Sequence, residues 1–453
     1  MPTDGRRVPV TSSDPVSGQA AGTGEVPGRW RRLAAITGTL WADSNEGSVL
    51  TTLAPVIINA LALPPSALGV LTSVSKAVGI LFGPLWTWIA HRTGRKGVLI
   101  VSTSFVAAGS AVTGLAQNFV QLLLLWSLVA VFAAASLPIV TEITADLFDE
   151  RARGRASGYT FGALAIVAAV LGPLIGQLSR FEGGWRIGFY ASGALGLLAV
   201  LFVALGFQDP GVGASEPALR GRTAERREAD ARLTLAKLRS LAAIPTFVLM
   251  LGQRLISGHL LVTTYGVLFL VKTYGFSTAT ASVVVLPLGI GYLVGTIAGG
   301  LVTDGLHARM PGKGRVIVLQ AAQFGFAVTA LVGMQADWHS IGVFAAFWAV
   351  MGLMQGINPG VNRPIVMAVV PPELRGAAFA LMLSVFEALA FIGFNLGAGL
   401  LIDVVGLKNV MLWIPGILML VNGVYCGALY RTYPRDMARL DAMLGEREAG
   451  KTI

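Results

Sequence analysis

Twelve apolar segments, each long enough to cross a lipid bilayer, occupy almost the whole chain between Leu33 and Tyr430. Hydrophobic residues make up 54% of the sequence and charged residues only 13%, whereas a soluble globular protein carries about 25% charged residues. In lipid, only helices and closed barrels satisfy every backbone polar group, and continuous apolar runs of about 20 residues are typical of helices. The sequence therefore predicts an all-α membrane protein with twelve transmembrane helices.

The predicted spans fall into two blocks of six, separated by a linker of mixed charge. We place the spans at residues 33–60, 66–90, 98–115, 119–145, 157–178, 186–207, 244–272, 279–303, 315–335, 340–366, 377–402 and 409–430. The expected organisation is a disordered tail (1–32), an N-terminal six-helix bundle (33–207), a linker (208–243), a C-terminal six-helix bundle (244–430) and a C-terminal tail (431–453).

Basic residues are distributed unevenly between the two sets of loops. If the N-terminus is cytoplasmic, the predicted outside loops hold only Arg180, Arg186, Lys272 and Lys408. All other loop Lys and Arg residues then lie inside, which predicts that both termini are cytoplasmic and that the chain sits in the plasma membrane. This topology also explains the net charge of +10, so we expect no nucleic-acid partner.

The two blocks of spans repeat each other in their loops. Arg153-Gly154-x-Ala156 opens the fifth span, and Arg375-Gly376-x-Ala378 opens the eleventh. The loop at 91–96 after the second span has a counterpart at 300–304 and 314–315 after the eighth. Equivalent loops in two six-span halves predict a duplicated bundle that holds its substrate between the halves and rocks around it.

These loops resemble the signature loop of the major facilitator superfamily. Arg92, Gly94, Arg95 and Lys96 match its basic part, whereas His91 stands where the family has Asp, and Gly300-x-x-x-Asp304 resembles the second copy. The segment at 172–176 resembles the last half of the family's antiporter motif, and the segment at 429–434 is similar to members near the Spinster-like branch. The resemblance implies two pseudo-symmetric six-helix bundles around a cavity lined by spans one, four, seven and ten.

Charged loop residues of this kind can form a conformational latch. A carboxylate at a helix end accepts hydrogen bonds from an Arg across the loop and from helix N-termini of the other half, in one conformation only. The alternative is that these residues merely cap helices on the cytoplasmic side. The candidate latch residues are His91, Arg92, Gly94, Arg95, Asp304, Arg153 and Arg375.

Six ionisable residues are predicted to lie within spans, where charged side chains are rare and usually functional. Asp43 and Glu46 are three residues apart and share one face of the first span. Two carboxylates in a low-dielectric site do not both ionise readily, so this pair is a candidate proton carrier. Glu46 also precedes Pro55 at a spacing that resembles the coupling acid of Spinster-like members. His259 and Glu387 are the further proton-coupling candidates.

The basic members of this group are candidates for substrate contact. Arg254 lies in the seventh span and is expected to pair with the acids of the first span or to anchor an anion. Lys76 and Glu387 are expected to pair as a mobile lock between the halves, unless each pairs separately. The tenth span contains prolines and amides, which favours a kinked helix that lines the cavity. Its candidate substrate-binding residues are Gln355, Asn358 and Asn362.

The remaining motifs are those of a transporter driven by a gradient. The sequence contains no Gly-x-x-x-x-Gly-Lys-Ser/Thr loop, no Ser-His-Asp or metal constellation, and a single cysteine, so we expect neither an enzyme nor a cofactor or metal. The favoured hypothesis is a monomeric secondary active transporter that exports a small amphipathic or lipophilic compound in exchange for protons. The alternatives are proton-coupled uptake of an anionic metabolite and a non-transporting membrane sensor.

Overall fold

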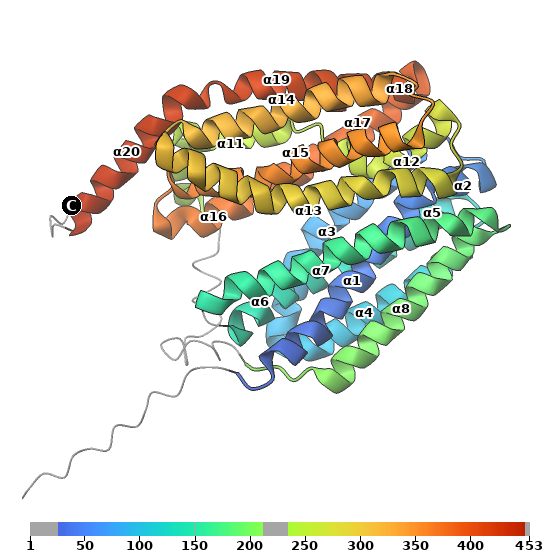
Figure 1. Cartoon of the computed structure of the whole chain (residues 1–453). Coiled ribbons are helices and arrows are strands. Elements are labelled where there is room, and N and C mark those ends of the chain that lie inside the picture. The colour runs from blue at the N-terminus through green and yellow to red at the C-terminus, as the bar shows by residue number, and fades with distance from the viewer. Residues whose placement is uncertain (1–25, 149, 212–233, 449–453) are drawn as a thin grey trace, which may run out of the picture.

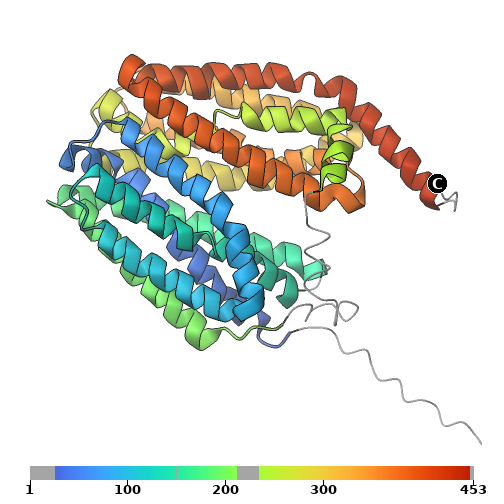
Figure 2. The ribbon, with the colours of Figure 1, turned by 180° about the vertical axis from the view of Figure 1, so that it is seen from behind.

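The structure, a computed structural model, describes residues 26–148, 150–211 and 234–448. Within these ranges every regular element is a helix and none is a strand. The helices form two halves that lie side by side, α1–α8 in one and α10–α20 in the other (Figure 1). The view from behind shows the same division (Figure 2). The predicted fold is therefore confirmed, while the boundaries of the tails and of the linker fall partly outside the described residues and stay predictions.

The N half, residues 29–206, holds the first six spans. Its fourth span is formed by two consecutive helices, and a short α2 extends the first. The helices are α1 (Arg29–Thr52), α2 (Ala54–Ala60), α3 (Ser66–Thr93), α4 (Arg95–Thr113), α5 (Phe119–Ala133), α6 (Ser136–Leu147), α7 (Glu150–Gln177) and α8 (Gly184–Gly206), with a single 3₁₀ turn at Leu178–Arg180.

The C half, residues 235–448, holds the other six spans, of which three are built from consecutive pieces. Its α-helices are α10 (Leu235–Ala242), α11 (Pro245–Leu255), α12 (Leu260–Tyr274), α13 (Thr278–Arg309), α14 (Gly314–Gln335), α15 (Ile341–Met367), α16 (Arg375–Phe379), α17 (Glu387–Val405), α18 (Leu407–Met411), α19 (Met419–Cys426) and α20 (Leu429–Glu448). A 3₁₀ turn, η3 (Pro372–Leu374), and two π-helical segments, η4 (Ala380–Phe386) and η5 (Leu412–Leu418), complete the half.

Eleven helical segments in the described part of the chain are long and apolar enough to cross a membrane. The one predicted span outside these eleven is the first, which begins with α1. It is less apolar because α1 carries Asp43, Glu46 and three arginines in its first turn. Even so, α1 packs against α7 and α8 in the interior of the N half. Asp43 and Glu46 lie beside α6 and α4, which removes these two charges from lipid.

Two of the spans are interrupted beside the residues that carry charge. The seventh breaks between α11 and α12, where Gly258 lies so close to the Ile414 carbonyl that a Cβ would stand 2.3 Å from its oxygen. The eleventh contains the π-helical segment η4, which ends directly before Glu387. A π-helical turn frees backbone groups from regular pairing and is frequent at functional sites.

Within the C half, α13 and α15 are joined by two facing rows of glycines. Gly291, Gly295 and Gly299 face α15, and Gly352, Gly356 and Gly360 face α13. A Cβ on Gly291 would lie 2.0 Å from the Ala349 carbonyl oxygen. Small residues at four-residue spacing let two helix backbones meet, which is the main way helices associate in lipid.

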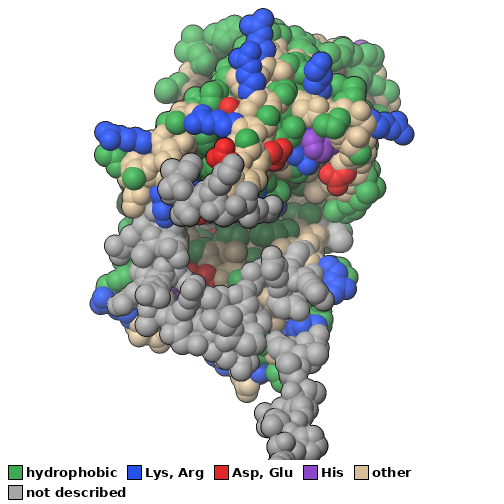
Figure 3. Space-filling view, turned by 90° about the vertical axis from the view of Figure 1, so that its left-hand side faces the viewer, with side chains coloured by type: hydrophobic (Ala, Val, Ile, Leu, Met, Phe, Trp, Pro, Cys, Tyr) green, Lys and Arg blue, Asp and Glu red, His purple; other side chains and the backbone are tan. Residues whose placement is uncertain are grey.

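The two halves touch each other at one end of the molecule. We call this the far end, since it lies opposite the terminus end, where α1 begins and α20 leaves the bundle (Figure 1). At the far end α3 packs against α17 and α7 against α13. Ser73 donates a hydrogen bond of 3.3 Å to the Ile392 carbonyl across this contact. At the terminus end, a hollow separates the halves, and hydrophobic side chains are visible on its walls (Figure 3).

Candidate functional site

The two acids of α1 lie against neighbouring helices of the N half without ionic partners. The Glu46 side chain is 3% exposed, close to Ser110 of α4, and Asp43 is close to Ser136 of α6. Neither Asp43 oxygen, nor Oε1 of Glu46, has a hydrogen-bond partner among the described residues. A buried carboxylate without hydrogen bonds is costly when charged, so these atoms are suited to carry a proton or to meet a ligand.

In the C half, an ion pair joins α11 and α17. Nη2 of Arg254 donates to Oε2 of Glu387 over 2.6 Å, and the two side chains are 12% and 28% exposed. The Nε atom of Arg254 is buried and makes no hydrogen bond within the described chain. Arg254 therefore pairs inside its own half, and the expected pair with the span-one acids is absent from this conformation.

Lys76 is close to Glu387 in the fold but does not pair with it here. It is exposed on α3, and its Nζ lies 5.7 Å from the centre of the Phe391 ring, one turn beyond Glu387 on α17. The expected lock between Lys76 and Glu387 is thus replaced by the Arg254–Glu387 pair. Because α3 and α17 pack together across the two halves, a small relative movement changes the distance between Lys76 and Glu387.

His259 lies at the break between α11 and α12 and is 3% exposed. Its ring meets Phe326 edge to face at 5.9 Å, and its Nδ1 has no hydrogen-bond partner in the described ranges. It is buried inside the C half, five residues from Arg254. Its predicted role in proton relay stays a prediction.

The amides of α15 differ in their surroundings. Asn358 accepts a 2.7 Å hydrogen bond from Gln323, which ties α15 to α14 inside the C half. Asn362 is buried, and its Oδ1 has no partner among the residues described, whereas Gln355 is half-buried. Asn358 is therefore engaged in holding helices together, and Asn362 and Gln355 retain free capacity for a ligand.

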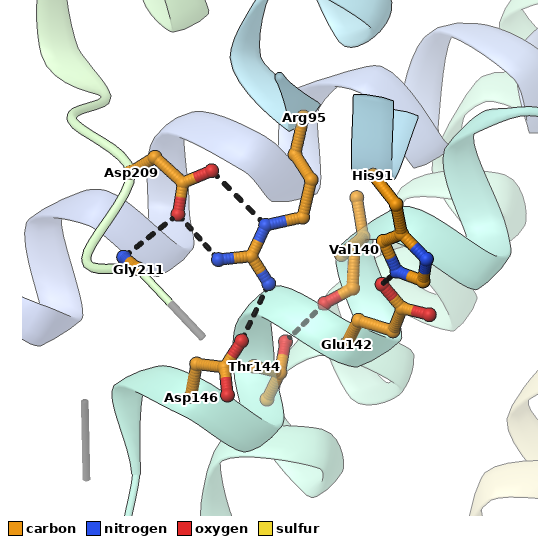
Figure 4. A network of polar contacts seen from close by, with 8 residues as sticks. All are labelled: His91, Arg95, Val140, Glu142, Thr144, Asp146, Asp209 and Gly211. Carbon is orange, nitrogen blue, oxygen red and sulfur yellow. Dashed lines mark hydrogen bonds and ion pairs between the residues drawn. The ribbon is translucent and has the colours of Figure 1, made fainter. Parts of the chain in front are cut away.

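A network of charges closes the N half at its terminus end, as Figure 4 shows. Arg95 is 4% exposed and donates to Asp146 at the end of α6 over 2.5 Å and to Asp209 beyond α8. Nε2 of His91 lies 3.0 Å from Oε2 of Glu142. Between His91 and Arg95, Gly94 has a φ of 102°, a conformation that glycine adopts readily and other residues do not.

Asp146 and Asp209 were not among the residues that the sequence singled out. Acids at helix ends are common and look like caps, and these two are 63 positions apart, with Asp146 following span four and Asp209 following span six. The available signal was the single cluster Arg92–Lys96, which lacked an acidic partner of its own in the loop. In the fold, Arg95 donates hydrogen bonds to both acids, one in α6 and the other in the segment that follows α8.

The corresponding loops of the C half are arranged differently. Arg375 donates to the carbonyls of Val370 and Met367, over 3.3 and 2.9 Å, and so caps the end of α15. Arg315 donates to the Tyr433 hydroxyl over 2.8 Å. Asp304 is exposed. Of the other latch candidates, Arg92 stacks on Trp88 at 4.0 Å, and the Arg153 side chain lies outside the described residues.

The sequence as a whole has known relatives. A sequence model of the Major Facilitator Superfamily matches residues 36–322. The chain belongs to the Major Facilitator Superfamily. It is accordingly a multi-pass membrane protein of a transporter family, which agrees with its spans and its two-half architecture.

Individual members of the superfamily resemble it over different lengths. The uncharacterized MFS-type transporter YtbD of Bacillus subtilis strain 168 is 27% identical over 401 residues, which are 86% of this chain and 93% of YtbD. Multidrug resistance protein 3 of the same strain is 33% identical over 132 residues, 29% of this chain and 26% of that protein.

A solved structure matches the fold over nearly its whole length. It is the crystal structure of a bacterial homologue of the human lysosomal transporter Spinster, in an inward-facing and unoccupied conformation. The match has a TM-score of 0.76 at 21% identity and covers 90% of this chain and 98% of the other. At this identity the likeness establishes the arrangement of the helices.

Proposed function

We propose that this transporter exports small amphipathic or lipophilic organic compounds in exchange for protons, by alternating access. The observation that carries the proposal is the pair of carboxylates on α1, which are enclosed by the N half and have oxygens without partners. Such groups change their charge when they bind or release a proton. A charged group near the middle of a membrane favours the conformation in which it is exposed to water. Glu46 is the proposed carrier and Asp43 its partner.

The surroundings of the two acids support a largely apolar substrate. Hydrophobic side chains are visible on the walls of the hollow between the halves (Figure 3), and a basic group of the C half, Arg254, is already neutralised by Glu387. The similarity of part of the chain to Multidrug resistance protein 3 agrees with export. With both termini cytoplasmic, the open end faces the cytoplasm, from which an exporter loads. We propose a monomer in the plasma membrane.

The test uses purified protein in liposomes with an imposed pH gradient. The probe is a lipophilic cationic dye whose fluorescence reports its accumulation. We expect Glu46→Gln to abolish dye movement driven by the pH gradient and to retain exchange driven by a dye gradient, because the glutamine has a similar volume but cannot carry a proton. Glu182→Gln, which alters an exposed acid in the loop before α8, is the matched control and should transport normally.

Full proton-driven flux in both Glu46→Gln and Asp43→Asn would contradict the proposed carriers. Accumulation of a monocarboxylate in place of the dye, lost in Arg254→Gln, would instead establish the alternative of anion uptake. Absence of flux for every probe, with ligand binding intact, would favour the sensor.

A further inference from the structure

A groove opens on the side of the N half, between α7 and α8, and α1 forms its floor. It has a volume of about 660 Å³. The floor consists of small residues, Ala34, Ala35 and Gly38, which leave space above α1. The walls are apolar and largely exposed, with Phe202 at 64% and Leu205 at 76% exposure. In Figure 1 the helices α7 and α8 diverge toward the terminus end, with α1 between them.

The position of the groove indicates what fills it. Both α7 and α8 belong to spans that are apolar enough to cross the bilayer, so the open side of the groove faces hydrocarbon. A void of this size would forfeit dispersion contacts along its whole lining, so a flexible acyl chain is the natural occupant. The groove lies on the face of α1 that packs on α8, where Gly38 meets Ala199, and Glu46 faces Ser110 of α4 instead. It is therefore a second site, separate from the acids.

The mouth of the groove is positively charged. Arg31 lies in the first turn of α1, lines the groove, is exposed, and has no ion pair among the described residues. It also lines an adjoining cavity of about 380 Å³ together with Gly28, Arg29 and Trp30. A Trp beside basic residues at a helix end is typical of the membrane interface, where lipid headgroups lie. Basic pockets beside transmembrane helices at this level attract anionic headgroups.

We propose that one anionic phospholipid occupies this groove, with an acyl chain along α1 between α7 and α8 and its headgroup against Arg31. The apolar floor and walls select a hydrocarbon chain, and the Arg31 guanidinium selects a headgroup with net negative charge. This inference does not depend on the direction of transport or on its coupling ion.

Native mass spectrometry of the full chain in detergent tests the headgroup. The probes are dioleoyl phosphatidylglycerol and, for comparison, dioleoyl phosphatidylcholine. We expect preferential retention of the phosphatidylglycerol, and a loss of about fivefold in its affinity in Arg31→Gln, since one basic residue near an anionic membrane surface has an effect of that size. Arg309→Gln, an exposed arginine at the terminus end of α13, is the control and should retain the lipid.

A second measurement places the chain in the groove. Phosphatidylglycerol with brominated acyl chains quenches nearby tryptophans, and Trp41 lines the groove. We expect quenching to fall in Trp41→Phe and in Ala163→Phe, which fills the groove from α7, but not in Ala168→Phe, which is exposed on the same helix. Equal retention of both lipids, unchanged affinity in Arg31→Gln, or unchanged quenching in Trp41→Phe would overturn the proposal.

Discussion

Arg254 and Glu387 lie 133 positions apart in the sequence, yet their side chains meet over 2.6 Å between α11 and α17. The pair joins two helices of the C half, whereas the acids of α1 belong to the N half. Glu387 follows the π-helical segment η4, and Lys76 of the other half lies over Phe391, one turn further along α17. Glu387 therefore has one basic partner, Arg254, within its own half. A relative movement of the halves can bring a second, Lys76, close to it.

The energy of this pair can be isolated by a double-mutant cycle. Arg254→Gln and Glu387→Gln should each lower the free energy of unfolding, because each leaves a partly buried charge without its partner. The double variant should recover part of the loss, with a coupling energy of about 1 kcal/mol. Thermal unfolding in detergent gives the four values. Strictly additive losses would show that the contact contributes nothing beyond its two separate side chains.

The far-end contact should depend on Gly69 of α3. A Cβ at this position would lie 2.2 Å from the Asn395 backbone carbonyl oxygen, which cannot move without shifting α17. Gly69→Val should therefore open the far end and expose Ser73, which is 1% exposed in this structure. The readout is maleimide labelling of Ser73→Cys in a Cys426→Ser background.

Gly79→Val provides the control for this experiment, since Gly79 lies on the same helix and has open space around its Cβ position. We expect labelling to rise severalfold with Gly69→Val and to stay at the background level with Gly79→Val. Equal labelling in the two variants would mean that the far end opens without regard to this contact.

Arg95 should stabilise the terminus end of the N half. Arg95→Gln leaves Asp146 and Asp209 close together without the buried cation, so we expect a loss of about 3 kcal/mol in the free energy of unfolding. Arg92→Gln removes an equal charge that stacks on Trp88 at an exposed position, and should cost much less. Unfolding by increasing mole fraction of a denaturing detergent compares the two. Similar losses in the two variants would mean that the network around Arg95 stabilises the fold no more than an exposed arginine does.

Asp304 is predicted to form its latch contacts only in the conformation in which the terminus end is closed. It is exposed here, so Asp304→Asn should leave the thermal unfolding temperature unchanged. We expect the same variant to lower the transport rate several-fold and to reduce crosslinking between the halves at the terminus end. Unchanged transport and crosslinking would leave Asp304 as a surface residue of α13.

The sidedness of the membrane insertion is also testable. Reporter fusions after Gly183, between α7 and α8, should read outside, and fusions after Gly211, beyond α8, should read inside. The reason is the excess of Lys and Arg in the loops on the side of Gly211. Alkaline phosphatase activity at the first site and green fluorescence at the second would agree with cytoplasmic termini, and the reverse pattern would exclude them.

The twelve spans and the two halves could be predicted because both depend on local properties of the chain. Apolar length fixes each span, and the facing of Asp43 and Glu46 follows from their three-residue separation on one helix. The partners of the buried charges could not be predicted in the same way. Glu387 has two basic candidates, Arg254 and Lys76, at the same expected depth, and only the packing of α11 against α17 decides between them.

The acidic partners of Arg95 in the N half could not be predicted from the sequence either. Asp146 lies in the last turn of α6 and Asp209 lies just beyond α8, where an acid needs no tertiary explanation, and nothing local connects either of them to Arg95. The C-half loops carry a similar sequence pattern but make different contacts, because Arg315 donates to the Tyr433 hydroxyl of α20 and forms no ion pair within the described ranges. A repeated motif therefore predicts equivalent positions but not equivalent bonding.

The length of α13 has a consequence for the membrane that surrounds the protein. At 1.5 Å per residue its 32 residues extend for about 48 Å, while the hydrocarbon layer is about 30 Å thick. The glycine rows tie α13 to α15, so α13 cannot adjust its tilt on its own. In a bilayer of different thickness, the C half must therefore tilt as a whole. The length of the lipid chains then affects the angle between the two halves.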